Sequence, residues 1–246
     1  MNIRSHLGIA IALGSVFGAV SAAESPVSIV ASACPVIPPN RTVNVVTSQP
    51  LSVGQNIVLA VAVDSADAVD LVVSGPSGVT WRGLGGHKSE ARNRSVLLLR
   101  GEALQTVAAG GTVSLNFGLV DAARSVCVRG MRYSSFVSGS ASVETDGQSM
   151  GNAVSTPTVT GKSNVTGGMA VAAFIFEANP NALTLSAGAV SDGGACNAAL
   201  DLCLRAAHQG DVVGSTSMDM QPASTSNWQA SLAVLSTPGI FKDGFE

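Results

Sequence analysis

The sequence predicts an all-β fold, a two-sheet antiparallel β-sandwich stapled by disulfides. Short stretches in which apolar and polar residues alternate recur along the chain, and clusters of Gly, Ser, Asn and Asp separate them. Helical periodicity is almost absent. The chain is 46% hydrophobic but only 12% charged, so small polar side chains rather than Lys and Glu cover its surface.

The expected strands follow one another at intervals typical of a sandwich. The stretch 169–176 is nearly continuously apolar, which predicts a central strand buried on both faces. The only candidate helical turn is 197–205. The expected strands are 42–47, 57–63, 69–73, 79–81, 95–100, 112–117, 125–137, 169–176, 183–185, 214–220 and 228–235.

The polar interval 144–162 is rich in Ser, Thr, Gly and Asn. We interpret it as a long crossover within one sandwich, because neither half of the chain has enough expected strands to close a core of its own. Residues 24–236 are therefore expected to form a single β-sandwich domain.

Residues 1–23 have the pattern of a cleaved secretory signal peptide. Arg4 precedes an apolar stretch from Leu7 to Val20, and the small residues Ser21, Ala22 and Ala23 follow it. That stretch is too short for a membrane span. We therefore expect an exported protein without a membrane span, in the periplasm, on the cell surface or outside the cell.

The charge balance excludes a nucleic-acid binder. The net charge is −3, and no dense array of Lys and Arg provides the electrostatic footprint that such a partner needs.

The four cysteines form an even set, which in an exported chain indicates two disulfides. Four cysteines allow three pairings, and the spacing favours a local loop staple together with a long-range tie for the N-terminal segment. The favoured pairs are Cys196–Cys203 and Cys34–Cys127. A zinc site is the alternative, but the gap between Cys196 and Cys203 fits zinc poorly.

No catalytic arrangement is predicted, and the protein is expected not to be an enzyme. There is no G-x-S-x-G motif, and we place His87 and His208 in ordinary loops. Paired carboxylates of a glycan-cleaving enzyme remain an alternative, with Glu177 as the carboxylate of most interest because it follows the most apolar strand. The carboxylate candidates are Glu90, Glu102, Glu144 and Glu177.

No cofactor is expected, and calcium is the one metal with candidate ligands. Asp64, Asp67 and Asp70 recur at intervals of three around an expected turn, where calcium could find several oxygen ligands. Asp192 with Asp201 in the cysteine loop is a weaker pair.

Basic residues concentrate beside Trp81 and form the best candidate ligand surface, suited to an anionic polysaccharide. The alternative is a solvated hairpin with Trp81 packed in the core; Trp228 is also interpreted as a core residue. The candidate surface consists of Trp81, Arg82, Lys88, Arg92, Arg94 and Arg100.

Several local phrases resemble a jelly-roll-like module that recurs in secreted and surface bacterial proteins. The phrases are VGQNIVLAV at 53–61, VTWRG at 79–83, GTVSLNF at 111–117 and WQASLAVL at 228–235. The resemblance implies a structural platform at the cell exterior and no catalytic set.

The end of the chain, IFKDGFE at 240–246, is similar to a short C-terminal ending of exported Gram-negative proteins. We interpret 237–246 as a tail with a role in sorting or processing. If so, deletion of 241–246 changes where the protein accumulates.

The favoured function is a secreted, non-enzymatic structural, adhesion or binding module. A lectin-like carbohydrate-binding domain and an extracellular glycan-cleaving enzyme are the alternatives, because sandwiches of this kind host all three. The expected partner is an extracellular polysaccharide or a surface protein.

Overall fold

The computed structural model describes residues 27–133, 142–152, 156–162, 168–177, 180, 182–212 and 215–236. The expected signal peptide 1–23 and tail 237–246 lie outside these residues. The described chain is all-β and antiparallel, as predicted, and its strands form four sheets rather than two.

The first eight strands build one sandwich, with β1-β8-β3-β6-β5 in one sheet and β2-β7-β4 in the other. In a jelly roll β5 belongs beside β4, but here it forms a hairpin with β6 instead. The strands are β1 (Val27–Ala33), β2 (Thr42–Val46), β3 (Asn56–Val63), β4 (Leu71–Ser74), β5 (Val79–Ser89), β6 (Arg94–Ala103), β7 (Thr112–Phe117) and β8 (Val126–Tyr133).

The next eight strands build a second sandwich of identical strand order. Its sheets run β9-β16-β11-β14-β13 and β10-β15-β12, so each strand occupies the place of the strand eight earlier. The strands are β9 (Ser142–Gly151), β10 (Thr158–Lys162), β11 (Gly168–Phe176), β12 (Leu183–Leu185), β13 (Ala189–Asn197), β14 (Leu202–Val212), β15 (Ser215–Pro222) and β16 (Trp228–Ser236).

Details of the backbone repeat as well as the strand order. The β5–β6 pairing has a β-bulge immediately before Gly85, and the β13–β14 pairing has one immediately before Gly193. Each hairpin then turns through a short 3-10 helix, η2 (Glu90–Arg92) or η3 (Ala198–Leu200). The next residue, Asn93 or Asp201, is left-handed in both, with φ of 48°. The two sandwiches are structural repeats.

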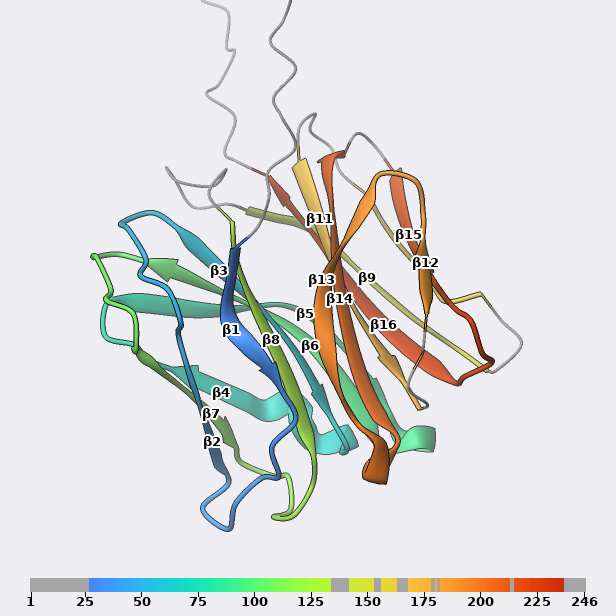
Figure 1. Cartoon of the computed structure of the whole chain (residues 1–246), viewed down its shortest axis with the longest axis horizontal. Helices are drawn as coiled ribbons and strands as arrows, with labels where there is room; N and C mark the ends of the chain where they lie inside the picture. Colours follow the sequence, from blue (N-terminus) through green and yellow to red (C-terminus); the bar gives the residue numbers. More distant parts are fainter. Residues whose placement is uncertain are drawn as a thin grey trace, which may run out of the picture.

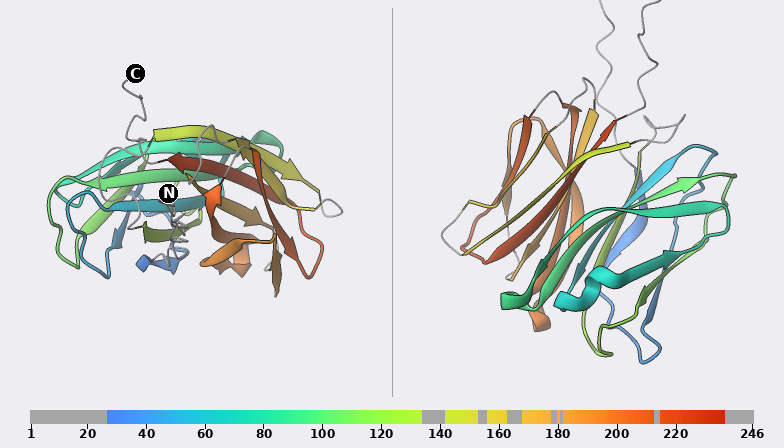
Figure 2. Two further views of the ribbon diagram at one scale, coloured as in Figure 1. Left: turned by 90° about the horizontal axis from the view of Figure 1, so that it is seen from above. Right: turned by 180° about the vertical axis from the view of Figure 1, so that it is seen from behind.

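The four sheets stack as four layers, with the two five-stranded sheets in the middle (Figure 1). Apolar side chains fill the space inside each sandwich and also the space between the two inner sheets. The view from above in Figure 2 shows β1 and β13 at one side of this stack and β5 and β9 at the other. We call the apolar cluster between the inner sheets the shared core.

The central strands are buried on both faces because an apolar layer lies on each side of them. All eight residues of β3 and all nine of β11 are buried. In β3, Leu59 packs inside the first sandwich whereas Ala60 packs in the shared core. The prediction for 169–176 is confirmed.

Three local expectations are wrong. The interval 144–162 is not a crossover, because it contains most of β9 and all of β10, whose small polar residues form edge strands. Each half of the chain has enough strands to close a two-sheet core of its own, whereas the sequence predicted too few. The expected helical turn at 197–205 is limited to η3, and β14 begins at Leu202.

That 24–236 behave as one domain stays a prediction, and the shared core supports it.

Both favoured disulfides are present. Cys34 is bonded to Cys127 within the first sandwich, and Cys196 to Cys203 across the β13–β14 hairpin. No helix of the described residues is long and apolar enough to cross a membrane.

Candidate functional site

The predicted basic surface is divided among several places. Arg100 lies in β6, a strand of an inner sheet that is covered on both faces, and is fully buried. Its Nε donates a hydrogen bond to Asn56 Oδ1 at 2.7 Å, and its Nη2 donates to Glu102 Oε2 at 3.2 Å. Burial lowers the pKa of Arg100, against the opposing effect of the Glu102 charge. Arg100 is therefore not a ligand contact.

Arg82 and Lys88 remain on the surface of β5. The Arg82 guanidinium lies 3.9 Å from Glu102, and the Lys88 ammonium lies 2.5 Å from Glu90. This hydrogen bond to Glu90 raises the pKa of Lys88. Both pairs are exposed enough for water to compete, so they hold their side chains weakly.

Arg92 and Arg94 link the first repeat to the second through Glu177. Their Nη1 atoms lie 3.5 and 3.6 Å from Glu177 Oε1, and Arg94 Nε lies 3.6 Å from Asp64 Oδ1. Asp64 and Glu177 directly follow the equivalent strands β3 and β11. Arg94 thus bridges two carboxylates in equivalent places in the two repeats.

Glu177 has further partners in its own repeat. Its other carboxylate oxygen accepts a hydrogen bond from Asn227 Nδ2, and its backbone N–H donates to Ser226 Oγ at 3.1 Å. Two guanidinium groups, rather than a second carboxylate, face Glu177. The side chain of Glu144 lies outside the described residues. This arrangement joins the repeats and does not resemble a glycosidase pair.

The aspartates considered for calcium have different local roles. Asp64 takes part in ion pairs, because Arg124 also lies 3.8 Å from its carboxylate. Asp67 and Asp70 belong to η1 (Ala66–Asp70), whose first turn is capped by Ser65. Within the described ranges, no three His, Cys, Asp or Glu side chains gather as a metal site would require. Calcium binding stays a prediction.

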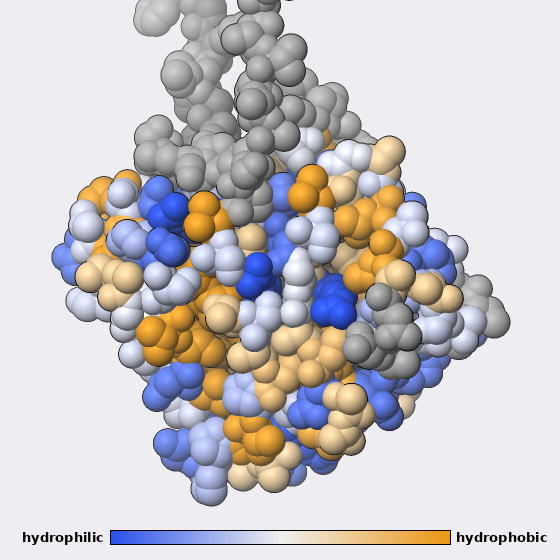
Figure 3. Space-filling view, viewed as in Figure 1, coloured by the Kyte–Doolittle hydropathy of each residue, from blue (hydrophilic) through white to orange (hydrophobic). Residues whose placement is uncertain are grey.

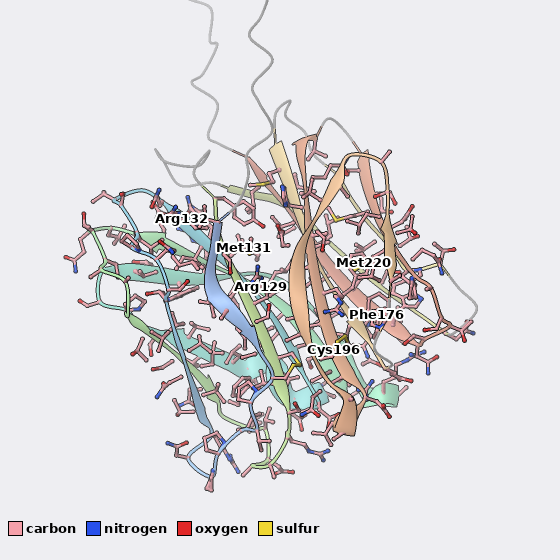
Figure 4. All side chains as sticks on the ribbon, in the orientation of Figure 1. Arg129, Met131, Arg132, Phe176, Cys196 and Met220 are labelled. Atoms are coloured by element: carbon pink, nitrogen blue, oxygen red, sulfur yellow. A yellow bond between two sulfur atoms is a disulfide. The ribbon has the colours of Figure 1, made fainter. Side chains whose placement is uncertain are left out.

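His208 lies in β14 and is buried, contrary to the expectation of a loop. Its Nδ1 lies 2.8 Å from Asp192 Oδ1, and Tyr133 OH donates to Asp192 Oδ2 at 3.0 Å. Arg129 Nε donates to the Asp192 carbonyl at 2.7 Å. Figure 4 places Arg129 between β8 and β13. We call Arg129, Tyr133, Asp192 and His208 the Asp192 cluster.

The Asp192 cluster was missed because its members are far apart in sequence. A His–Asp pair can serve a general base, but each of these two residues is only 4% exposed. The cluster joins β8 of the first repeat to β13 and β14 of the second. Its role is to satisfy polar groups within the contact between the repeats.

His87, like His208, lies in a strand rather than in the expected loop. It belongs to β5, and its Nε2 lies 3.2 Å from Met150 Sδ.

A cleft opens at one edge of the first sandwich, between the edge strands β4 and β5. Its volume is about 460 Å³. Leu71 of β4 forms one wall and the glycine-rich part of β5 the other, over leucines of β6. The full lining is Leu71, Gly83, Leu84, Gly85, Gly86, Leu97, Leu98 and Leu99. We call this the β5 cleft.

Glycines leave the β5 cleft open. A Cβ atom at Gly83 would meet nothing within 4 Å, whereas one at Gly86 would lie 2.5 Å from the Leu97 side chain. In the second repeat, Gly194 pairs with Arg205 as Gly86 pairs with Leu97. Burial lowers the pKa of Arg205. The position of the apolar Leu97 in the first repeat is thus occupied by the basic Arg205 in the second, so the apolar lining is particular to the first repeat.

Trp81 stands on β5 next to this glycine segment. It is partly buried against the core of the first sandwich, and its Nε1 donates to the Gly75 carbonyl at 2.5 Å. Trp228 is buried in the second sandwich. Trp81 is thus held in place as part of the scaffold.

The β5 cleft lies on the side of the molecule away from β1 and β13. Figure 3 shows the face that carries β1 and β13, where apolar and hydrophilic residues are interspersed. β5 lies at the other side of the molecule (Figure 2, right).

No family model, curated protein or solved structure matches the chain.

Proposed function

We propose that the protein is an exported, non-enzymatic binding module of the cell exterior and that the β5 cleft is its binding site. The cleft is the observation that carries the proposal. Its volume of about 460 Å³ falls in the range of ligand sites, and its lining is largely apolar. The leader pattern and the two disulfides support export.

The surroundings of the ionisable side chains favour binding over catalysis. Glu177 bridges to Arg92 and Arg94, and Asp192 bonds to His208 and Tyr133. These contacts connect the repeats and engage these ionisable side chains within the scaffold. An open apolar site on such a scaffold suits recognition of a partner.

The test is binding of the purified, oxidised protein, residues 24–246, to a panel of extracellular polysaccharides and purified surface proteins, with and without calcium. We expect specific binding to at least one member, and loss of that binding in Gly83→Leu, which fills the cleft. Gly118→Leu is the matched control, because a Cβ there also meets nothing within 4 Å. Binding that survives Gly83→Leu, or no binding to any member, would contradict the proposal.

A further inference from the structure

His87 of β5 and Met150 of β9 meet where the edge strands of the two inner sheets face each other. The His87 Nε2 lies 3.2 Å from the Met150 Sδ. β5 and β9 lie at the same side of the molecule (Figure 2). A thioether is a weak hydrogen-bond acceptor, so a hydrogen bond gains little from this contact. Imidazole nitrogen and thioether sulfur are, however, both ligands for copper.

Both side chains point into the space between the repeats. His87 pairs with Val96 of β6, and Met150 pairs with Gln229 of β16. Directly paired residues have their side chains on the same face of a sheet. Val96 belongs to the shared core, as does Ala233, which lies four residues beyond Gln229 on the same face of β16. The contact between His87 and Met150 therefore lies at the edge of the shared core.

Buried oxygen atoms without partners lie on the same strand faces. Gln229 is 1% exposed and Ser231 is 0% exposed, and buried Ser89 follows His87 by two residues in β5. Within the part of the chain that the structure describes, Gln229 Oε1, Ser231 Oγ and Ser89 Oγ have no hydrogen-bond partner. Such atoms cost stability, and a bound ion is one reason for a protein to keep them. Because Gln229 is the cross-strand neighbour of Met150, its Oε1 can reach the pair as a third donor.

The donors suit a soft cation. They are a neutral imidazole nitrogen, a thioether sulfur and an amide oxygen, without the carboxylates that calcium needs or the thiolates of structural zinc sites. Thioether ligands select Cu(I). Since metal–nitrogen and metal–sulfur bonds are roughly 2.0 and 2.3 Å long, one ion bound to both atoms holds them about 3.3–3.7 Å apart. The flexible Met150 side chain can make this small adjustment, and it is 44% exposed, so an ion can enter from solvent.

We propose that His87 Nε2, Met150 Sδ and Gln229 Oε1 bind one Cu(I) ion between β5 and β9. The site shares no residue with the β5 cleft, so it goes beyond the proposed function and does not depend on it. Its ligands come from both repeats. An ion bound there stabilises the folded chain and adds a link between the repeats.

The probe is Cu(I), added without oxygen to the oxidised protein, residues 24–246, in competition with a chromogenic Cu(I) chelator. We expect one ion per chain. Met150→Leu and His87→Gln should each weaken binding at least about 100-fold, more than the loss of a typical outer-shell partner. Met131→Leu is the matched control, because Met131 is buried in the shared core and should leave the affinity unchanged.

Ag(I), a redox-inert substitute for Cu(I), allows the same site to be observed by NMR. We expect one equivalent of Ag(I) to shift the methyl signal of Met150 and the imidazole signals of His87, while the methyl signal of Met131 stays in place. Shifts at Met131 with the Met150 signal unchanged would overturn the inference.

Gln229→Leu separates metal binding from packing. Leucine fills a similar volume without the unpartnered oxygen, so the metal-free variant should be at least as stable in urea as the parent protein. Its affinity for Cu(I) should fall about tenfold. Full affinity in this variant would overturn the assignment of Gln229 as a donor. The whole inference is overturned if Cu(I) does not bind, if Met150→Leu or His87→Gln binds as tightly as the parent, or if Zn(II) binds more tightly than Cu(I).

Discussion

Arg100 and His208 occupy equivalent positions in the two repeats. Leu98 pairs with Gly85 and Ala206 with Gly193, and Arg100 and His208 each follow two residues later. Both side chains are buried, but Arg100 bonds to Asn56 and Glu102 of its own repeat. His208 belongs to a cluster that spans both repeats. Equivalent positions have thus acquired different partners, and the two repeats are not interchangeable.

The Asp192 cluster should contribute strongly to stability. Asp192→Ala leaves Tyr133 and His208 without their acceptor inside the shared core. We expect the free energy of unfolding in urea to fall by about 2–4 kcal/mol. Exposed Asp121 provides the control, since Asp121→Ala should change it by less than about 0.5 kcal/mol. Similar small effects in both variants would show that the cluster is unimportant.

The bridge from Arg94 to Asp64 and Glu177 should stabilise the contact between the repeats. Arg94→Met removes a largely buried guanidinium and leaves both carboxylates with fewer partners. We expect a loss of about 1–2 kcal/mol in urea unfolding. Lys88→Met, which removes an exposed pair, should have no measurable effect. An equal response of the two variants would contradict this account of the bridge.

The two repeats should unfold together, because they share a core. Trp81 reports on the first repeat and Trp228 on the second. In Trp228→Phe and Trp81→Phe the remaining fluorophore follows one repeat at a time. In each variant, we expect the urea midpoint followed by fluorescence to coincide with the urea midpoint followed by circular dichroism. Separated midpoints within one variant would mean that 24–236 are two domains.

The long-range disulfide should stabilise the fold more than the hairpin disulfide. Cys34 and Cys127 are 93 residues apart in sequence, and Cys196 and Cys203 are 7 apart. The chain-entropy model predicts losses of about 4–5 and about 2 kcal/mol when each pair is replaced by Ser. The measurement is urea unfolding of the two double variants. A larger loss for the hairpin pair would contradict the model.

The parts of the fold that the sequence predicts best are the strands with continuous or strictly alternating apolar residues. β3 and β11 were recognised because burial on both faces leaves a continuous apolar run. β5 was cut short at Trp81, because its glycines look like a turn although they lie at a bulge. β9 and β10 were missed because edge strands can be built from small polar residues.

The sequence does not reveal the repeat, because the two halves have the same strand order and pairing register but few identical amino acids. Gly85-Gly86 and Gly193-Gly194 are the visible trace of it, together with Asn93 and Asp201 after the two turns. A comparison of the halves at constant spacing would have found this signal.

For the site, a run of basic residues is a poor guide within strands. β6 belongs to an inner sheet that is covered on both faces, so Arg100 is buried, whereas Arg82 and Lys88 stand on the edge strand β5 and are exposed. The β5 cleft depends on the absence of side chains next to leucines of another strand, which no local pattern reveals.

The most direct measurement for the central claim is amide hydrogen exchange of the protein with and without the ligand that the panel identifies. We predict that protection is confined to the strands of the β5 cleft and is strongest at Gly83, Gly85 and Gly86. Protection of β2 and β7, or of the outer sheet β10-β15-β12, with the amides of β5 unchanged, would show that the β5 cleft is not the binding site.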